Sequence, residues 1–285
     1  MGVSLVVYGE TDVGLVRAKN EDAFVIMDLT SGAAVHPKQM TRCDVGERGV
    51  LMAVSDGIGG HQAGEVASAL VIESLCREMA SVYAGESSEV RLERATVEAN
   101  REVWQASQFP GRENMGATLT ALFVCGRTAF VAEVGDSRAY LLRGGLIAQV
   151  TRDQSYVQLL VDAGAMSLDQ AKTSGLSNVV LQAMGLKPEI SVALGKIELR
   201  ERDCLVLCSD GLTNKLRDEE LRQTILAAPR LDVAGAQLVA AAKARGGEDN
   251  ITAIVAGVSG DLPPLVSGES IAETFFVLQE FLPTS

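Results

Sequence analysis

The stretch VLMAVSDGIGG (residues 50–60) says more about the fold than any other part of the chain. Val50 to Val54 form an apolar run typical of a buried strand, and Ser55-Asp56-Gly57 follows directly. The same order returns where Cys204 to Cys208 lead into Ser209-Asp210-Gly211. A single Asp-Gly usually marks a turn, because glycine accepts a positive φ and Asp bonds its own backbone. Here two buried-type strands are each followed by the same Ser-Asp-Gly triplet. This repetition indicates acids on loops that rigid strands hold in place, where catalytic groups are common.

Two further acidic motifs, Asn20-Glu21-Asp22 and Gly247-Glu248-Asp249-Asn250, extend this pattern over most of the chain. Carboxylates from such distant segments are what a site for two hard cations needs, because Mg²⁺ and Mn²⁺ prefer oxygen ligands and keep several waters. Two such ions about 3.5–4 Å apart can turn a water into a nucleophile. The acids therefore predict metal-assisted hydrolysis of a phosphate ester.

Composition limits the possible partners. The 285 residues are 47% hydrophobic, which is ample for a core, and carry a formal net charge of −12. This charge argues against nucleic acid or an anionic membrane as a partner, because both require a basic face. Several acids converging on cations would explain part of the excess.

The N-terminal residues lack the basic lead of a signal peptide, and no apolar run approaches the ~20 residues of a membrane span. The 5 cysteines are odd in number and have no Cys-x-x-Cys spacing, which favours a reducing cytoplasm and disfavours zinc. The 2 histidines are too few for a histidine-rich metal site.

The hydrophobic periodicity changes between helical and strand-like along the chain. It predicts helices at 66–83, 88–107, 153–163, 218–228 and 232–244, and strands at 117–124, 128–134, 138–143, 146–151, 192–199, 204–208 and 251–258. Paired helices between clusters of antiparallel strands indicate a layered α+β domain. Without a linker-like stretch before residue 259, we expect one domain over residues 1–258.

Residues 259–285 form a tail that begins with the structure-breaking Gly260-Asp261-Leu262-Pro263-Pro264. Its residues 271–282 could form an amphipathic helix. Such a helix could pack back on the domain, which we favour, or dock a partner.

Six segments in register now give a specific resemblance. They are Arg17-Ala18-Lys19-Asn20-Glu21-Asp22, Asp56-Gly57-Ile58-Gly59-Gly60-His61-Gln62-Ala63-Gly64, Met115-Gly116-Ala117-Thr118-Leu119-Thr120, Gly135-Asp136-Ser137-Arg138-Ala139-Tyr140, Ser209-Asp210-Gly211-Leu212-Thr213 and Gly246-Gly247-Glu248-Asp249-Asn250-Ile251-Thr252. Over roughly residues 5–258 the chain resembles the metal-dependent PP2C family of Ser/Thr protein phosphatases, in its bacterial form. The resemblance implies a four-layer α-β-β-α sandwich, with two central antiparallel sheets flanked by helices. It also implies two or three Mn²⁺ or Mg²⁺ ions, and phosphorylated proteins as substrates, including targets of a bacterial Ser/Thr kinase or the kinase itself.

Roles for the acids follow from their chemistry and the resemblance. Asp56 is expected to bridge two metals, and Gly57 to offer its carbonyl oxygen to one of them. Asp210 and Asp249 are expected to complete the ligands of the other metal. Glu21 and Asp22 are adjacent and cannot both face one cation from an extended strand. The resemblance implies that Glu21 is a ligand of the second metal and that Asp22 holds metal-bound waters. It also implies that Asp136 binds a weaker third metal, which it shares with Asp210.

Other residues are expected around these acids. Arg17 resembles the family's arginine for the substrate phosphate, because a guanidinium can hold two phosphate oxygens. Asn250 is expected to orient Asp249 or its turn, and Thr118 to form hydrogen bonds near the site. Eukaryotic members place a histidine, proposed as a general acid, where this chain has Ile58. His61 could face the cleft instead or bond the following helix.

Three other functions could use a similar set of acids. A pseudophosphatase that only binds would need a lost metal ligand, and every matched acid is present. An Asp-nucleophile hydrolase would need Asp-x-Asp at a strand end, which is absent at Asp56. A small-molecule phosphatase with this fold stays open, because the expected substrate flap, residues 153–185, departs from the family. Leu181-Gln182 stands there in place of the common Thr-Arg.

Overall fold

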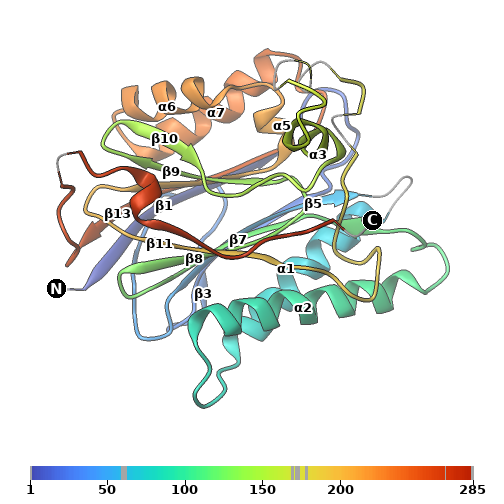
Figure 1. Cartoon of the computed structure of the whole chain (residues 1–285), viewed down its shortest axis with the longest axis horizontal. Coiled ribbons are helices and arrows are strands. Elements are labelled where there is room, and N and C mark those ends of the chain that lie inside the picture. Colours follow the sequence, from blue (N-terminus) through green and yellow to red (C-terminus); the bar gives the residue numbers. More distant parts are fainter. Residues whose placement is uncertain are drawn as a thin grey trace.

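The computed structural model describes residues 2–58, 63–167, 170, 174–176, 179–266 and 268–283. Two antiparallel sheets lie face to face at its centre (Figure 1). One sheet has the order β10-β9-β12-β13-β1-β4, and the other has the order β14-β11-β8-β7-β5-β2-β3, with β6 paired to β5. The strands are β1 (Val3–Asp12), β2 (Asp22–Asp28), β3 (Ala33–Ala34), β4 (Thr41–Asp44), β5 (Val50–Ile58), β6 (Gly116–Ala117), β7 (Leu119–Cys125), β8 (Thr128–Val134), β9 (Arg138–Arg143), β10 (Leu146–Gln149), β11 (Ala193–Glu198), β12 (Cys204–Cys208), β13 (Ile251–Gly260) and β14 (Phe275–Gln279).

Helices cover the outer face of each sheet and complete the four layers. In Figure 1, α1 (Gly64–Ala80) and α2 (Ser88–Ser107) lie on one side of the sandwich, and α6 (Asp218–Ala227) and α7 (Leu231–Ala244) lie on the other. The shorter helices α3 (Tyr156–Asp162) and α5 (Asp210–Thr213) lie at one end. The α-β-β-α sandwich expected from the resemblance is confirmed. Within the described residues, no helix has the length and apolar character to cross a membrane.

Burial on both faces explains the unbroken apolar run of β5. Val50, Met52 and Val54 pack between the sheets, while Leu51 and Ala53 pack under the helices, and all five are fully buried. A strand covered on both sides cannot alternate apolar and polar residues. The run therefore ends where β5 leaves the core, at Asp56.

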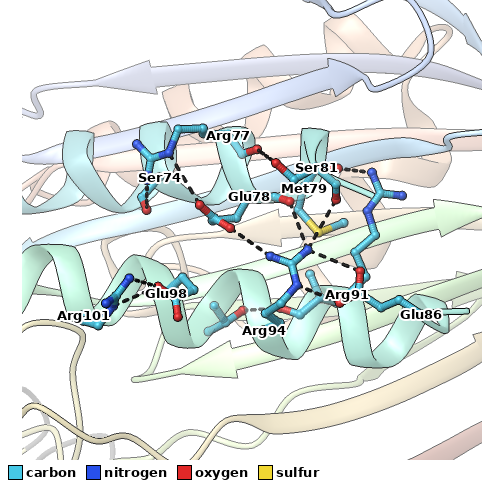
Figure 2. Close-up of polar contacts among 12 residues, drawn as sticks. Ser74, Arg77, Glu78, Met79, Ser81, Glu86, Arg91, Arg94, Glu98 and Arg101 are labelled. Atoms are coloured by element: carbon cyan, nitrogen blue, oxygen red, sulfur yellow. Dashed lines mark hydrogen bonds and ion pairs between the residues drawn. The ribbon is translucent and has the colours of Figure 1, made fainter. Parts of the chain in front are cut away.

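Charged side chains join α1 to α2, as Figure 2 shows. Arg94 on α2 donates from Nη1 to Glu78 on α1 (2.8 Å) and from Nε to Glu86 (2.7 Å). Arg77 on α1 pairs in the same way with Glu102 on α2. Each of these carboxylates is matched by an arginine from the neighbouring segment.

The tail is ordered as a strand, so the helix expected over 271–282 is wrong. Ile271–Glu273 forms a single 3-10 turn, and Phe275–Gln279 then pairs antiparallel with β11. The open edge of β11 supplies backbone partners that an isolated segment lacks, and aromatic and β-branched residues suit a strand. The tail does pack back on the domain, with Phe275 half-buried against the core between the sheets.

Candidate active site

The predicted acids gather at one end of the sandwich because antiparallel pairing brings their strand ends together. Asp22 opens β2 and lies directly opposite Asp56 near the end of β5. Asp210 begins α5 after β12, and Asp249 precedes β13, which is the antiparallel neighbour of β12. Asp136 follows β8 in the turn to β9.

Thr118 fixes the backbone at Asp56. Its hydroxyl accepts the Asp56 N–H (3.0 Å), and its own N–H donates to the Asp56 carbonyl (2.8 Å). The same hydroxyl bonds to that of Ser137 (2.7 Å), the neighbour of Asp136. Thr118 therefore holds two of the acidic loops in one arrangement, as the sequence predicted for a residue near the site.

Asp22 is buried, and only one of its carboxylate oxygens is satisfied. Oδ2 accepts from Ser209 Oγ (2.7 Å) and Thr252 Oγ1 (2.6 Å), whereas Oδ1 has no hydrogen-bond partner among the described residues. No role at the site was predicted for Ser209 or Thr252. The repeated Ser-Asp-Gly triplet was the available signal for Ser209. Its hydroxyl also accepts the Thr252 N–H (3.0 Å).

Gly57 and Glu21 meet the first turn of α1. The Gly57 N–H donates to the Glu21 carbonyl (3.1 Å), and a Cβ on Gly57 would lie 2.3 Å from the Gly64 carbonyl oxygen. The protein's own backbone therefore leaves no room for a side chain at this position. A Cβ on Gly64 would lie 3.0 Å from Glu21 Oε1, so this carboxylate lies against the N-terminus of α1. The helix dipole favours a negative charge at that position.

Asn250 ties the Arg17 loop to the turn before β13. Its Oδ1 accepts the Glu21 N–H (2.8 Å), and its Nδ2 donates to the carbonyls of Val13 (3.0 Å) and Lys19 (2.9 Å). Its own N–H donates to Asp249 Oδ1 (2.9 Å). We expected Asn250 to orient Asp249 or its turn, and the larger part of its bonding instead holds the segment that carries Glu21.

Arg17 reaches the acids but contacts one of them directly. Its Nη2 donates to Asp249 Oδ2 at 2.9 Å, and both side chains are partly exposed. Asp210 Oδ2 accepts from Asn214 Nδ2 (3.1 Å), while its buried Oδ1 has no hydrogen-bond partner in the described part of the chain. An arginine expected to bind phosphate thus pairs with an expected metal ligand.

Burial and mutual repulsion raise the pKa values of these acids. Burial, with smaller contributions from Asp210 and Asp249, raises the pKa of Asp22 to about 7. Burial next to Asp210 raises the pKa of Asp136 to about 8. The pKa of Asp56 lies well above its ordinary value because of burial first and then of Asp22. Without cations, the cluster disfavours its own charged form.

These residues fit hard divalent cations. Unpartnered buried oxygens on Asp22 and Asp210 are each costly unless something ligates them. Within the described residues, no group of three or more His, Cys, Asp or Glu side chains stands ready to hold a metal ion. Mg²⁺-type sites do not require such a group, because these ions take one or two carboxylates and complete their shells with water and substrate oxygens.

The flap residue that departs from the family has a structural role. Gln182 Nε2 donates to Gln154 Oε1 (3.0 Å) and to the Ser191 carbonyl (2.8 Å), and its Oε1 accepts the Ser191 N–H (2.8 Å). The Leu181 N–H donates to the Gln154 carbonyl (2.7 Å). Gln182 therefore fastens the return of the flap to the sheet. His61 lies outside the described residues, and Ile58 is half-buried at the end of β5.

The chain is similar to known phosphatases over most of its length. Residues 39–241 match the family model for protein phosphatase 2C. The serine/threonine protein phosphatase PstP of Mycobacterium tuberculosis is 34% identical over 263 residues, which are 90% of this chain and 46% of PstP, so the chain spans about half of that relative. The serine/threonine phosphatase Stp of Listeria innocua is 31% identical over 249 residues, 86% of this chain and 92% of Stp.

Solved structures agree with the sequence comparison. The crystal structure of the PstP catalytic domain in complex with 2 manganese ions superposes with a TM-score of 0.75 at 32% identity, and covers 90% of this chain and 100% of that one. Stp1 from Staphylococcus aureus gives a TM-score of 0.79 at 30% identity, and covers 89% of this chain and 95% of that one. The chain therefore belongs to the protein phosphatase 2C family of serine/threonine phosphatases, in the form represented by bacterial PstP and Stp.

Proposed function

We propose that this chain is a metal-dependent protein phosphatase that hydrolyses phosphoserine and phosphothreonine. The observation that carries the proposal is the pair of buried, unpartnered oxygens on Asp22 and Asp210, within a cluster of acids whose pKa values are raised. Such a cluster costs stability unless cations enter it. Family membership names the reaction that these cations serve.

The chain's own oxygens would hold the ions. Asp56, the Gly57 carbonyl, Glu21, Asp210 and Asp249 are the proposed ligands of two Mn²⁺ or Mg²⁺ ions. When bound, these ions would activate water for direct attack on the phosphate and neutralise its charge. Two manganese ions in the PstP catalytic domain support this assignment.

Hydroxyl groups next to the acids would keep the ligands in place, and Asp136 would add a further oxygen. We propose that Asp136, close to Asp210, serves a third ion, and that Asp22 holds water at the site. Ser209 and Thr252 fix the orientation of Asp22 through its Oδ2. Thr118 keeps Asp56 and the Asp136 loop at a constant separation.

Arg17 would exchange partners during binding. Its guanidinium pairs with Asp249 on a partly exposed loop, so cations that draw on Asp249 would release the arginine. A released guanidinium can donate two hydrogen bonds to phosphate oxygens. We propose that Arg17 orients the substrate phosphate in this way.

The proposed substrates are proteins phosphorylated by a Ser/Thr kinase, the kinase itself among them. The net charge of −12 supports protein over nucleic acid as the partner. We further propose that the enzyme acts in the cytoplasm, in keeping with its 5 free cysteines.

Hydrolysis of matched peptides tests the proposal. Purified protein in Mn²⁺ should release phosphate from a phosphothreonine peptide, and EDTA should abolish this release. The Asp56→Asn variant should stay nearly inactive at every Mn²⁺ concentration. A phosphotyrosine peptide and a sugar phosphate serve as competing substrates. Full activity in EDTA, or a clear preference for the sugar phosphate, would contradict the proposal.

A further inference from the structure

A cavity of about 560 Å³ lies over the edge of the sheet that β8, β11 and β14 form. β8, β11 and β14 form its floor, and the segment 149–155 with part of α3 covers it. The tail closes one side, from Phe275 to Pro283. None of the proposed metal ligands lines this space. Its size falls within the range of small-molecule sites, about 300–1,000 Å³.

Most of the lining is apolar. Val131, Val150, Leu181, Phe275, Val277 and Phe281 contribute to it. Phe275 and Val277 come from the tail strand, so this cavity depends on the segment that lies beyond the residues matched to the family model. An apolar cavity with an aromatic wall suits a ring or a short hydrocarbon body.

Glu133 on β8 is the most deeply buried of the charged residues in this lining. Its side chain is 2% exposed, and its Oε2 accepts the Arg152 N–H at 2.9 Å. No donor within the described residues reaches its Oε1. The hydrogen bond from the Arg152 N–H uses only Oε2, so it does not explain why a second carboxylate oxygen is buried here. A buried acceptor without a partner costs stability unless a ligand or water completes it.

Charge around the cavity selects the sign of that ligand. Arg152 pairs with Asp162 (2.6 Å), and Asp153 pairs with Arg138 (2.6 Å). Of the acids that line the cavity, Glu133 and, at the rim, Glu280 form no ion pair with any described residue. An anionic ligand would meet repulsion here, and a cationic one would be attracted. Burial raises the pKa of Glu133 well above its ordinary value, and a bound cation would lower it again.

We propose that this cavity binds a small amphipathic amine, with its apolar body against Phe275 and Val131 and its ammonium group donating to Glu133 Oε1. Hydrogen bonds between charged groups are about twice as strong as neutral ones, and more so away from water. The amine supplies the missing donor and the missing positive charge together.

Hydrogen bonds connect this site to the flap and to Asp136. The Glu133 carbonyl accepts from Gln154 Nε2 (3.1 Å), and the Gly135 N–H donates to Gln154 Oε1 (3.0 Å). Gln182 donates to that same oxygen (3.0 Å). Gln154 therefore holds both the flap return and the Asp136 turn, and it lines the cavity next to Glu133.

Binding of three probes with the same phenylethyl body tests the proposal on the full chain in saturating Mg²⁺, so that the acidic cluster is already occupied. The probes are 2-phenylethylamine, neutral 2-phenylethanol and anionic 3-phenylpropionate, each titrated while backbone NMR signals are followed. The amine should shift signals of Leu181 and Leu194, bind about tenfold or more tightly than the alcohol, and leave the anion without detectable binding. Equal affinity of amine and alcohol, or shifts confined to the acidic cluster, would overturn the proposal.

Matched variants assign the interaction to one carboxylate. Glu133→Gln keeps an acceptor for Arg152 and should reduce amine affinity to that of the alcohol. Glu280→Gln removes the same charge at the exposed rim and should change amine affinity less than about twofold. If Glu133→Gln does not fold, Val277→Trp at the partly exposed mouth should abolish binding of amine and alcohol alike. Unchanged amine binding in either Glu133→Gln or Val277→Trp would place the amine elsewhere.

Discussion

The interface between α1 and α2, called the α1–α2 seam here, and the active site use carboxylate groups in opposite ways. At the seam, Glu78 and Glu86 share the guanidinium of Arg94, and Arg94 lowers the pKa of Glu86 (Figure 2). At the site, burial and neighbouring acids raise the pKa values of Asp22 and Asp56. Balanced charge at the seam contributes to stability, whereas unbalanced charge at the site leaves a requirement for cations. Local charge balance therefore distinguishes Glu78 and Glu86 from Asp22 and Asp56.

The largest expected effect comes from removing an unbalanced acid. Asp56→Asn should lower kcat on a phosphothreonine peptide by at least about 10²-fold, because it removes a proposed ligand of both ions. In EDTA the same variant should melt higher than the wild type, by about 2–4 °C for each kcal/mol of repulsion relieved. Steady-state kinetics and thermal unfolding measure the two effects.

Asp44→Asn is the control for this variant, because Asp44 is an exposed acid paired with Arg42. It should leave both kcat and melting temperature nearly unchanged. An Asp56→Asn protein that melts lower than the wild type in EDTA would show that the site is balanced after all.

Arg17 is the next largest test, because it brings positive charge to the unbalanced side. Arg17→Ala should raise KM for a phosphopeptide by about tenfold and leave kcat within a few-fold, if it binds ground and transition states equally. Lys19→Ala, which removes a neighbouring exposed cation paired with Glu65, is the matched control. Unchanged KM in the Arg17 variant would remove its role with phosphate.

The pH dependence of stability in EDTA should separate the two regions further. Asp22 and Asp136 stay protonated in the folded protein up to pKa values of about 7 and 8, while the unfolded chain loses these protons near pH 4. The folded state then binds more protons, so the free energy of unfolding falls as pH rises from about 4 to 8.

Urea unfolding at pH 5 and pH 8 measures this fall. Mn²⁺ should reduce it, because cations favour the ionised carboxylates. Asp56→Asn should also make the slope shallower. A metal-free protein that becomes more stable between pH 5 and pH 8 would contradict the electrostatics described for the site.

The smallest effect is expected at the seam. Glu78→Gln removes one partner of Arg94 in a partly buried pair and should reduce the free energy of unfolding by about 0.5–1 kcal/mol. Its kcat and its Mn²⁺ dependence should equal those of the wild type. A kinetic change in this variant would mean that the seam communicates with the site.

The sequence predicted the acids well because each sits in a short motif with its own turn chemistry. Asp56 and Asp210 could be found without knowing which strands pair. The hydrogen bonds from Ser209 and Thr252 to Asp22 could not, because they join residues 187 and 230 positions away from Asp22. The strand at 275–279 was missed for a related reason: its conformation depends on the free edge of β11, which no local pattern reveals.

The tail strand also covers a sheet edge that could otherwise pair with another copy of the chain. Phe275–Gln279 occupies the edge of β11, where backbone N–H and C=O groups would otherwise face solvent. An uncovered edge is a template for pairing with another chain. The register shift between Leu194 and Gly195 makes the pairing of the tail with β11 irregular, which increases the local twist. A chain ending before residue 270 would therefore tend to self-associate through β11, and fast amide exchange along Ala193–Glu198 would precede its aggregation.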